Sequence, residues 1–149
     1  MNSINEILKA KGDVSIVLNR EDGSVENIDI HNLVVNTGLN YIVSRMKDTA
    51  ANAMSHMELG TGTTAAAAAD TGLQTAISGS RVALTSTTVS GNTITYVASF
   101  PAGTGTGAVT EAGIFNASSA GTMACRTVFP VVNKQAGDSM TVTWTVTVS

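Results

Sequence analysis

The chain ends in SMTVTWTVTVS, Ser139–Ser149, where apolar and hydroxyl side chains alternate without a break. The apolar set is Met140, Val142, Trp144, Val146 and Val148. Side chains on a strand point to opposite faces with a period of two, so the pattern predicts a long strand with one buried face. Because the alternation continues to the final residue, we expect the C-terminus to be a structural part of the fold.

Similar alternation recurs along the chain between short turn sequences that contain glycine. The predicted strands are 14–18, 25–30, 57–59, 81–89, 94–100, 109–115, 122–129 and 139–149. Proline cannot donate to a ladder, so Pro101 and Pro130 are expected to end pairing. About eight strands at short spacing, with one early helix, predict a mainly β protein: an antiparallel two-sheet β-sandwich of jelly-roll type.

One helix is predicted near residues 38–47. Leu39, Ile42, Val43 and Met46 recur at helical spacing, and Asn36 or Thr37 can cap the helix. The run Ala65–Ala69 has no polar face to orient a helix, so we expect a loop there, or a single turn that ends near Asp70–Gly72.

The first residues predict a separate N-terminal arm, 1–12, ahead of a single β-sandwich domain, 13–149. Ile4, Ile7 and Leu8 fall at helical spacing, and Gly12 ends the segment. A helix this short is not stable alone in water. We therefore expect the arm to dock on the β-sandwich domain or to become ordered on a neighbouring subunit. These three apolar side chains are therefore candidate partner-binding residues.

The composition favours contact with other proteins. Charged residues make up 13% of the 149 residues and aromatic residues 4%, whereas an ordinary soluble domain has roughly 25% charged residues. The surface must then consist largely of Thr, Ser, Asn, Gly and Ala. Such groups cost less free energy to desolvate than Lys or Glu does, which suits a protein interface.

Charge and hydropathy argue against other partners. The net charge is −3 and the eight Lys and Arg residues are scattered, so nucleic acid is not an expected partner. No apolar run reaches the roughly 18 residues of a membrane-spanning helix, so no membrane partner is expected. The first residues do not have the pattern of a secretory leader, so we expect synthesis in the cytosol. Cys125 is the one cysteine and is expected to be a small core residue.

Two glycine-rich segments resemble nucleotide-binding loops only superficially. Gly60–Thr64 lacks the lysine of a phosphate loop, so we interpret it as a tight loop in which glycine takes unusual φ and ψ. Gly103–Gly107 is followed by strand-like sequence rather than by a helix, so a dinucleotide fingerprint is not supported. No cofactor is predicted.

No catalytic or metal-binding constellation is apparent. His31 and His56 lie far apart and have no companion ligand at metal-binding spacing, and no Gly-x-Ser-x-Gly elbow occurs. Four carboxylates cluster around one predicted hairpin, where a solvated edge is favoured over a calcium site: Glu21, Asp22, Glu26 and Asp29. We therefore expect that the protein is not an enzyme.

Glu111 is a charged residue in the middle of a predicted strand, and Arg126 lies on the next one. Two interpretations stay open: a cross-strand ion pair within the chain, or an ion pair between subunits. Both residues are candidate partner contacts on the second interpretation.

An ordered set of short motifs resembles a family of small virion proteins of tailed bacteriophages. The motifs are Asn32–Leu39, Leu59–Thr64, Asp70–Leu73, Thr110–Phe115, Arg126–Pro130 and Gly137–Trp144. The similarity extends from about residue 14 to residue 149. The arm lies outside it.

The resemblance implies a structural virion protein without catalytic residues. The expected function is capsid decoration: a cement protein that bridges and stabilises neighbouring capsid subunits. Its partners would be the major capsid protein or other virion proteins, with self-association into a homo-oligomer and assembly in the host cytoplasm. The alternative is a tail-fibre, collar or baseplate component that contacts the host. A hydrolase would require a paired acid and base that the sequence does not offer.

Overall fold

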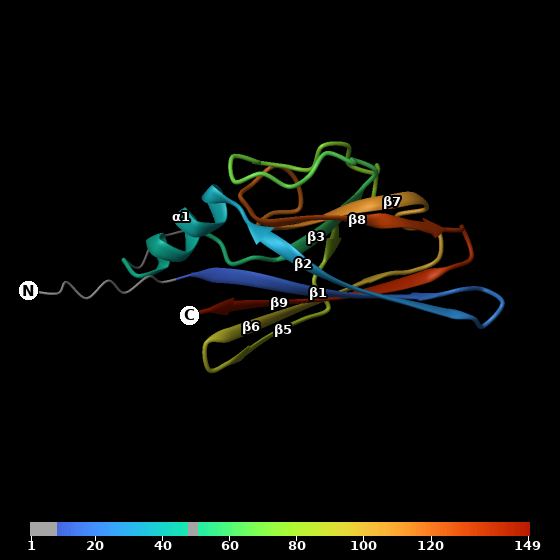
Figure 1. Cartoon of the computed structure of the whole chain (residues 1–149), viewed down its shortest axis with the longest axis horizontal. Helices are drawn as coiled ribbons and strands as arrows, with labels where there is room; N and C mark the ends of the chain where they lie inside the picture. The colour runs from blue at the N-terminus through green and yellow to red at the C-terminus, as the bar shows by residue number, and fades with distance from the viewer. Residues whose placement is uncertain (1–8, 48–50) are drawn as a thin grey trace, which may run out of the picture.

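A computed structural model describes residues 9–47 and 51–149 of the chain. It contains one antiparallel sheet in the order β4-β3-β7-β8-β2-β1-β9-β6-β5, curled into a half-barrel, and one helix (Figure 1). The strands are β1 Ala10–Asn19, β2 Val25–Val34, β3 His56–Gly60, β4 Val82–Ala83, β5 Ser86–Ser90, β6 Thr93–Phe100, β7 Gly107–Phe115, β8 Met123–Lys134 and β9 Ser139–Val148. The helix is α1, Asn36–Arg45. In the described part of the chain, this helix is neither long nor apolar enough to cross a membrane.

The C-terminal segment forms a central strand of one half of the sheet, as its alternation predicted. β9 lies between β1 and β6, and Trp144 is opposite Val14 on one side and Tyr96 on the other. Trp144 is fully buried, and its apolar neighbours face the inside of the half-barrel. Beyond the strand, Ser149 and Lys9 exchange backbone hydrogen bonds of 2.7 and 2.8 Å.

The prediction of a two-sheet sandwich is wrong, because β2 joins both halves into a single sheet. Its residues Val25–Asn32 pair with β1, and its last two, Leu33 and Val34, pair with β8 (Figure 1). A sandwich and a curled sheet both bury one face of each strand, so both give the same alternation. The pattern could not show that one strand changes partner along its length.

The predicted strand 81–89 is two strands at opposite margins of the sheet. β4 pairs with β3, and β5 pairs with β6. Only Leu84 and Thr85 separate them: the Leu84 N–H donates to the Ser55 carbonyl and the Thr85 N–H to the Val97 carbonyl. The run between Leu84 and Val89 is all hydroxyl residues, so it carries no apolar periodicity that could reveal the change of partner.

Pro130 does not end pairing, which corrects a second prediction about the strands. β8 runs from Met123 to Lys134 through the proline. The register with β7 shifts here, since Val109 is opposite Val132 while Glu111 is opposite Val128. Pro130 therefore lies in a bulge of the pairing with β7. On the other side of β8, β2 pairs only with Cys125 and Arg126. The N–H group that Pro130 lacks therefore removes no ladder hydrogen bond. Pro101 directly follows the end of β6, as predicted.

α1 begins two residues earlier than predicted and presents a different face to the sheet. Its N-cap is Val35, without a capping side chain, and the Thr37 hydroxyl donates to the Met123 carbonyl at 2.6 Å. Gly38 is buried so close to β8 that a Cβ would lie 2.1 Å from the Ala124 carbonyl oxygen. Three of the four predicted apolar positions are instead exposed, at 40%, 63% and 85%: Leu39, Val43 and Met46.

The described chain overlaps the predicted N-terminal arm at its end. Ala10–Gly12 belong to β1 and pair with β9. Ile4, Ile7 and Leu8 lie outside the described residues.

The sheet buries most of its apolar side chains on the inside of the half-barrel, but β7 is covered on both faces. Outside, Phe115 and Met123 pack with Val35 and with Leu73 of the connection 61–81. This connection crosses the outer face of β7 and β8, so it positions the polar network described next.

Candidate functional site

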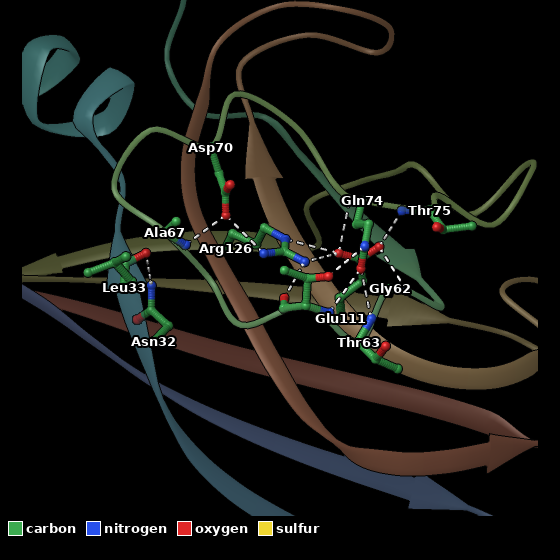
Figure 2. A network of polar contacts seen from close by, with 11 residues as sticks. Asn32, Leu33, Gly62, Thr63, Ala67, Asp70, Gln74, Thr75, Glu111 and Arg126 are labelled. Carbon is green, nitrogen blue, oxygen red and sulfur yellow. Dashed lines mark hydrogen bonds and ion pairs between the residues drawn. The ribbon is translucent and has the colours of Figure 1, made fainter.

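Glu111 and Arg126 form an ion pair on the covered outer face of β7 and β8 (Figure 2). The guanidinium donates from Nε and Nη2 to Oε2 of Glu111, at 2.9 and 2.8 Å. Glu111 is 0% exposed and Arg126 is 2% exposed. Of the two interpretations left open by the sequence, the structure therefore confirms the ion pair within the chain. A role of these two residues in partner binding stays a prediction.

The Glu111 carboxylate also accepts three backbone hydrogen bonds from the covering connection. The N–H groups of Thr75 and Gly62 donate to Oε1 at 2.7 and 3.1 Å, and that of Gln74 donates to Oε2 at 3.0 Å. Burial acts to raise the pKa of Glu111, but these bonds and Arg126 outweigh it, so the pKa lies below its usual value. The carboxylate is therefore ionised at neutral pH and fastens the connection to the sheet.

Arg126 ties down an earlier part of the same connection. Its Nη1 donates to Oδ2 of Asp70 at 2.9 Å, and its Nη2 donates to the Thr64 carbonyl at 3.0 Å. The same Asp70 oxygen accepts from the Ala67 N–H at 2.8 Å, which closes the loop 67–70 (Figure 2). The predicted loop at Ala65–Ala69 is confirmed, and these contacts hold it.

The glycines of Gly60–Thr64 make room for the Glu111 carboxylate. A Cβ on Gly60 would lie 2.4 Å from Oε1 of Glu111, and a Cβ on Gly62 would lie 2.6 Å from the same atom. Neither glycine has positive φ. The tight-loop interpretation therefore holds, but its stated reason was wrong, because the loop needs space rather than unusual dihedral angles.

A shallow depression of about 400 Å³ adjoins the network and is bordered by Asp70, Gln74 and Arg126. Gln74 accepts from the N–H groups of Thr63 and Thr64, each at 2.9 Å. Asp70, Gln74 and Arg126 are thus each already hydrogen-bonded within the network. This arrangement can hold a loop in place.

A second polar cluster, which the sequence did not reveal, lies at the end of the sheet where the β1–β2 and β8–β9 turns meet. Asp138 accepts from the Gln135 N–H at 2.8 Å, from the Glu21 N–H at 3.0 Å and from Arg20 at 3.2 Å. The bond from Gln135 is the largest cause that lowers the pKa of Asp138. Buried Lys134 donates to the Asp138 and Pro101 carbonyls at 2.6 and 3.0 Å. These bonds lock the two turns together.

A third cluster centres on Arg81. Its guanidinium makes two 3.2 Å bonds to Glu58, lies 3.7 Å from the centre of the Phe115 ring and donates to the Ala120 carbonyl at 2.8 Å. It fastens the turn 116–121 to the sheet. The one available sequence signal was an arginine at the start of a long stretch without charged residues.

The histidines and the acidic hairpin do not converge on one site. His31 Nδ1 lies 2.6 Å from an oxygen of Asp13, and His56 Nδ1 lies 2.7 Å from the Ser55 hydroxyl. In the hairpin, Asp22 accepts from the Ser24 N–H and hydroxyl, as a turn residue does. Within residues 9–47 and 51–149, no three His, Cys, Asp or Glu side chains are grouped to hold a metal ion.

No family model matches the chain, and the searches of curated proteins and of solved structures return no match either.

Proposed function

We propose that this chain is a structural protein of a tailed-bacteriophage virion that binds capsid subunits as a decoration, or cement, protein. One observation carries the proposal: the buried charged groups serve to fasten loops to the sheet, while the span 82–110 contains no charged residue. That span includes the whole of β5 and β6. A surface of hydroxyl and small apolar groups is cheap to desolvate against another protein.

Four of the six motifs that resemble virion proteins meet at the Glu111 network. Leu59–Thr64, Asp70–Leu73, Thr110–Phe115 and Arg126–Pro130 each contribute a residue to it or pass beside it. Here Thr110 adds a hydroxyl bond of 2.7 Å to the Gly62 carbonyl. Residues far apart in sequence thus serve one structural purpose, the attachment of the 61–81 connection. The residues that resemble virion proteins are therefore ones that stabilise the fold, which supports a structural role.

Two surfaces suit contact with capsid subunits. The outer face of β9 presents a row of threonines, and Thr145 donates to or accepts from Thr95 of β6 at 3.2 Å. Leu39 and Val43 of α1 and Met46 at its C-cap form an exposed apolar stripe. Exposed apolar groups on a helix that is already seated on a sheet are typical of a binding surface.

A cement protein stabilises a shell by multivalent display. Each contact with a capsid subunit can be modest, because the copies are arranged on a symmetric lattice and act together. Neutral surfaces also make such binding less sensitive to salt than a charged interface would be.

The test is the number of copies in purified virions, measured by quantified protein gels, together with co-sedimentation of the protein with empty capsids. The proposal expects on the order of hundreds of copies and saturable capsid binding. A small multiple of three or six would assign the protein to the tail, which is the alternative position. Absence from mature particles would overturn both.

A further inference from the structure

We propose that β5 is a self-association edge, and that two copies of this chain pair through it in an antiparallel, two-fold symmetric manner. The inference goes beyond the proposed function and does not depend on the position of the protein in a virion. β5 forms one margin of the sheet (Figure 1). All five of its residues are exposed, and Val89 is 70% exposed.

The two margins of the sheet differ in how they are protected. β4, at the opposite margin, has only two residues. Natural proteins usually protect an edge strand by shortness, by charge, by proline or by a covering element. β5 is longer, contains neither charge nor proline, and pairs with β6 alone among the described residues. An edge of this kind is a template for another strand.

The hydrogen bonds on the far side of β6 show which groups of β5 are unpaired. The Val148 N–H donates to the Asn92 carbonyl at 3.0 Å, next to the pair Thr93–Thr147. In an antiparallel ladder, alternate residues direct both backbone groups to the same neighbour. Even-numbered residues of β6 therefore bond to β9, and the odd-numbered ones bond to β5: Thr93, Thr95 and Val97.

The partners of those odd-numbered residues on β5 are Ser90, Thr88 and Ser86. Thr87 and Val89 therefore direct their N–H and C=O groups to the free edge. An incoming antiparallel strand uses both residues if the two-fold axis passes through Thr88. Thr87 of one copy then exchanges both backbone bonds with Val89 of the other. Any other two-fold register leaves one of these residues opposite the turn or opposite Thr85, whose N–H is already bonded.

The side chains are self-complementary in that register. Thr88 lies opposite Thr88 of the second copy, Ser86 opposite Ser90, and Thr87 opposite Val89. Hydroxyl pairs and β-branched pairs are favourable across antiparallel strands, and no like charges meet. The symmetry is closed, so the expected product is a dimer rather than a filament. Five-residue strands give a small interface, so we expect a dissociation constant in the micromolar range.

Sedimentation velocity over a concentration series tests the inference with variants at the axis. In Thr88→Lys and in Thr88→Glu, like charges lie directly opposite, so each variant alone should dimerise about tenfold more weakly or worse. An equimolar mixture of the two should regain the dimer as a Lys–Glu heterodimer. The matched controls, Ser99→Lys and Ser99→Glu, place the same charges on an exposed position of β6 away from the edge. They should dimerise as the unmodified protein does.

A cross-link gives an independent readout. Thr88 faces its own copy in a non-hydrogen-bonded pair, whose close Cα atoms suit a disulfide. Thr88→Cys should therefore form a covalent dimer with oxidised glutathione, whereas Thr87→Cys should not, and native Cys125 is buried. The proposal is overturned if the unmodified protein stays monomeric at its highest soluble concentration. It is equally overturned if both charged variants dimerise normally or if their mixture does not recover.

Discussion

Arg126 reaches Glu111 diagonally across two paired strands, because its direct neighbour in the register is Gly113, while Val128 lies opposite Glu111. Glycine at the position opposite Arg126 puts no side chain between the guanidinium and the carboxylate. The ion pair lies under a long connection that has no regular secondary structure of its own beyond a single bridge, Gly60 to Ala76. The network therefore replaces the ladder bonds that would otherwise fix such a segment.

Replacing Glu111 by glutamine should cost about 3–5 kcal/mol of unfolding free energy, because Arg126 would stay buried with its main counter-charge removed. Urea denaturation measures the loss. Glu26→Gln is the matched control: Glu26 also pairs with an arginine, Arg20, but its side chain is 50% exposed, so its loss should stay under about 1 kcal/mol. Equal effects of the two substitutions would contradict the structural role of the Glu111 network.

Acid should destabilise the fold through Glu111 and Asp138, the two carboxylates that accept backbone hydrogen bonds from the loops. The pKa values of Glu111 and Asp138 are lowered in the folded chain from ordinary values of 4.5 and 3.8. As the pH falls, the unfolded chain takes up these protons first, so the stabilisation is complete above about pH 4.5 and is lost below it. Thermal unfolding midpoints at a series of acidic pH values should show this decline. Glu111→Gln should reduce its slope, and an unchanged slope would exclude Glu111 as a cause.

Gly38→Ala should destabilise the protein by about 1–3 kcal/mol, because the new methyl group would overlap the Ala124 carbonyl and force α1 away from β8. Gly72→Ala provides the control, since a Cβ there meets no atom within 4 Å. That substitution should be close to neutral. The comparison can be made by thermal unfolding, and a neutral Gly38→Ala would show that α1 is not seated on β8 as described.

Removal of residues 2–8 should weaken capsid co-sedimentation, and the thermal unfolding midpoint of the variant is measured beside it to check that β1, Ala10–Asn19, still folds. The expectation follows from the predicted arm. A second variant, with Ile4, Ile7 and Leu8 replaced by serine, tests whether apolar contact rather than length is responsible. Undiminished binding by both variants would remove the arm from the mechanism.

The sequence was most informative where a strand buries one face regularly. The strand after Asp138, the strands around Gly23 and the strand after Asn92 were predicted within a few residues, because alternation and turn glycines are local signals. The architecture was missed because β2 changes partner at Leu33, and β4 and β5 diverge at Leu84. Both events depend on which distant strand supplies hydrogen bonds, and side-chain periodicity does not record that choice.

The sequence indicated only two residues of the Glu111 network, Glu111 and Arg126. Glu111 and Arg126 stood out because charged residues are rare in the strands. Asp70 and Gln74 did not, since their contacts join positions well separated in the chain. The spacing Gly60-x-Gly62 was a usable signal, but it was attributed to dihedral freedom instead of to a carboxylate that lies against both glycines.

The position of β9 between β1 and β6 has a consequence for biosynthesis. β1 pairs with β2 and β6 pairs with β5, each with a neighbour that is close in sequence, but β1 and β6 are joined only when β9, which separates them, has emerged from the ribosome. This half of the sheet therefore stays incomplete until β9 has been synthesised, and contacts between segments so far apart in sequence form slowly. Until β9 is made, a nascent chain exposes the unpaired sides of β1 and β6 to chaperones and to other nascent chains.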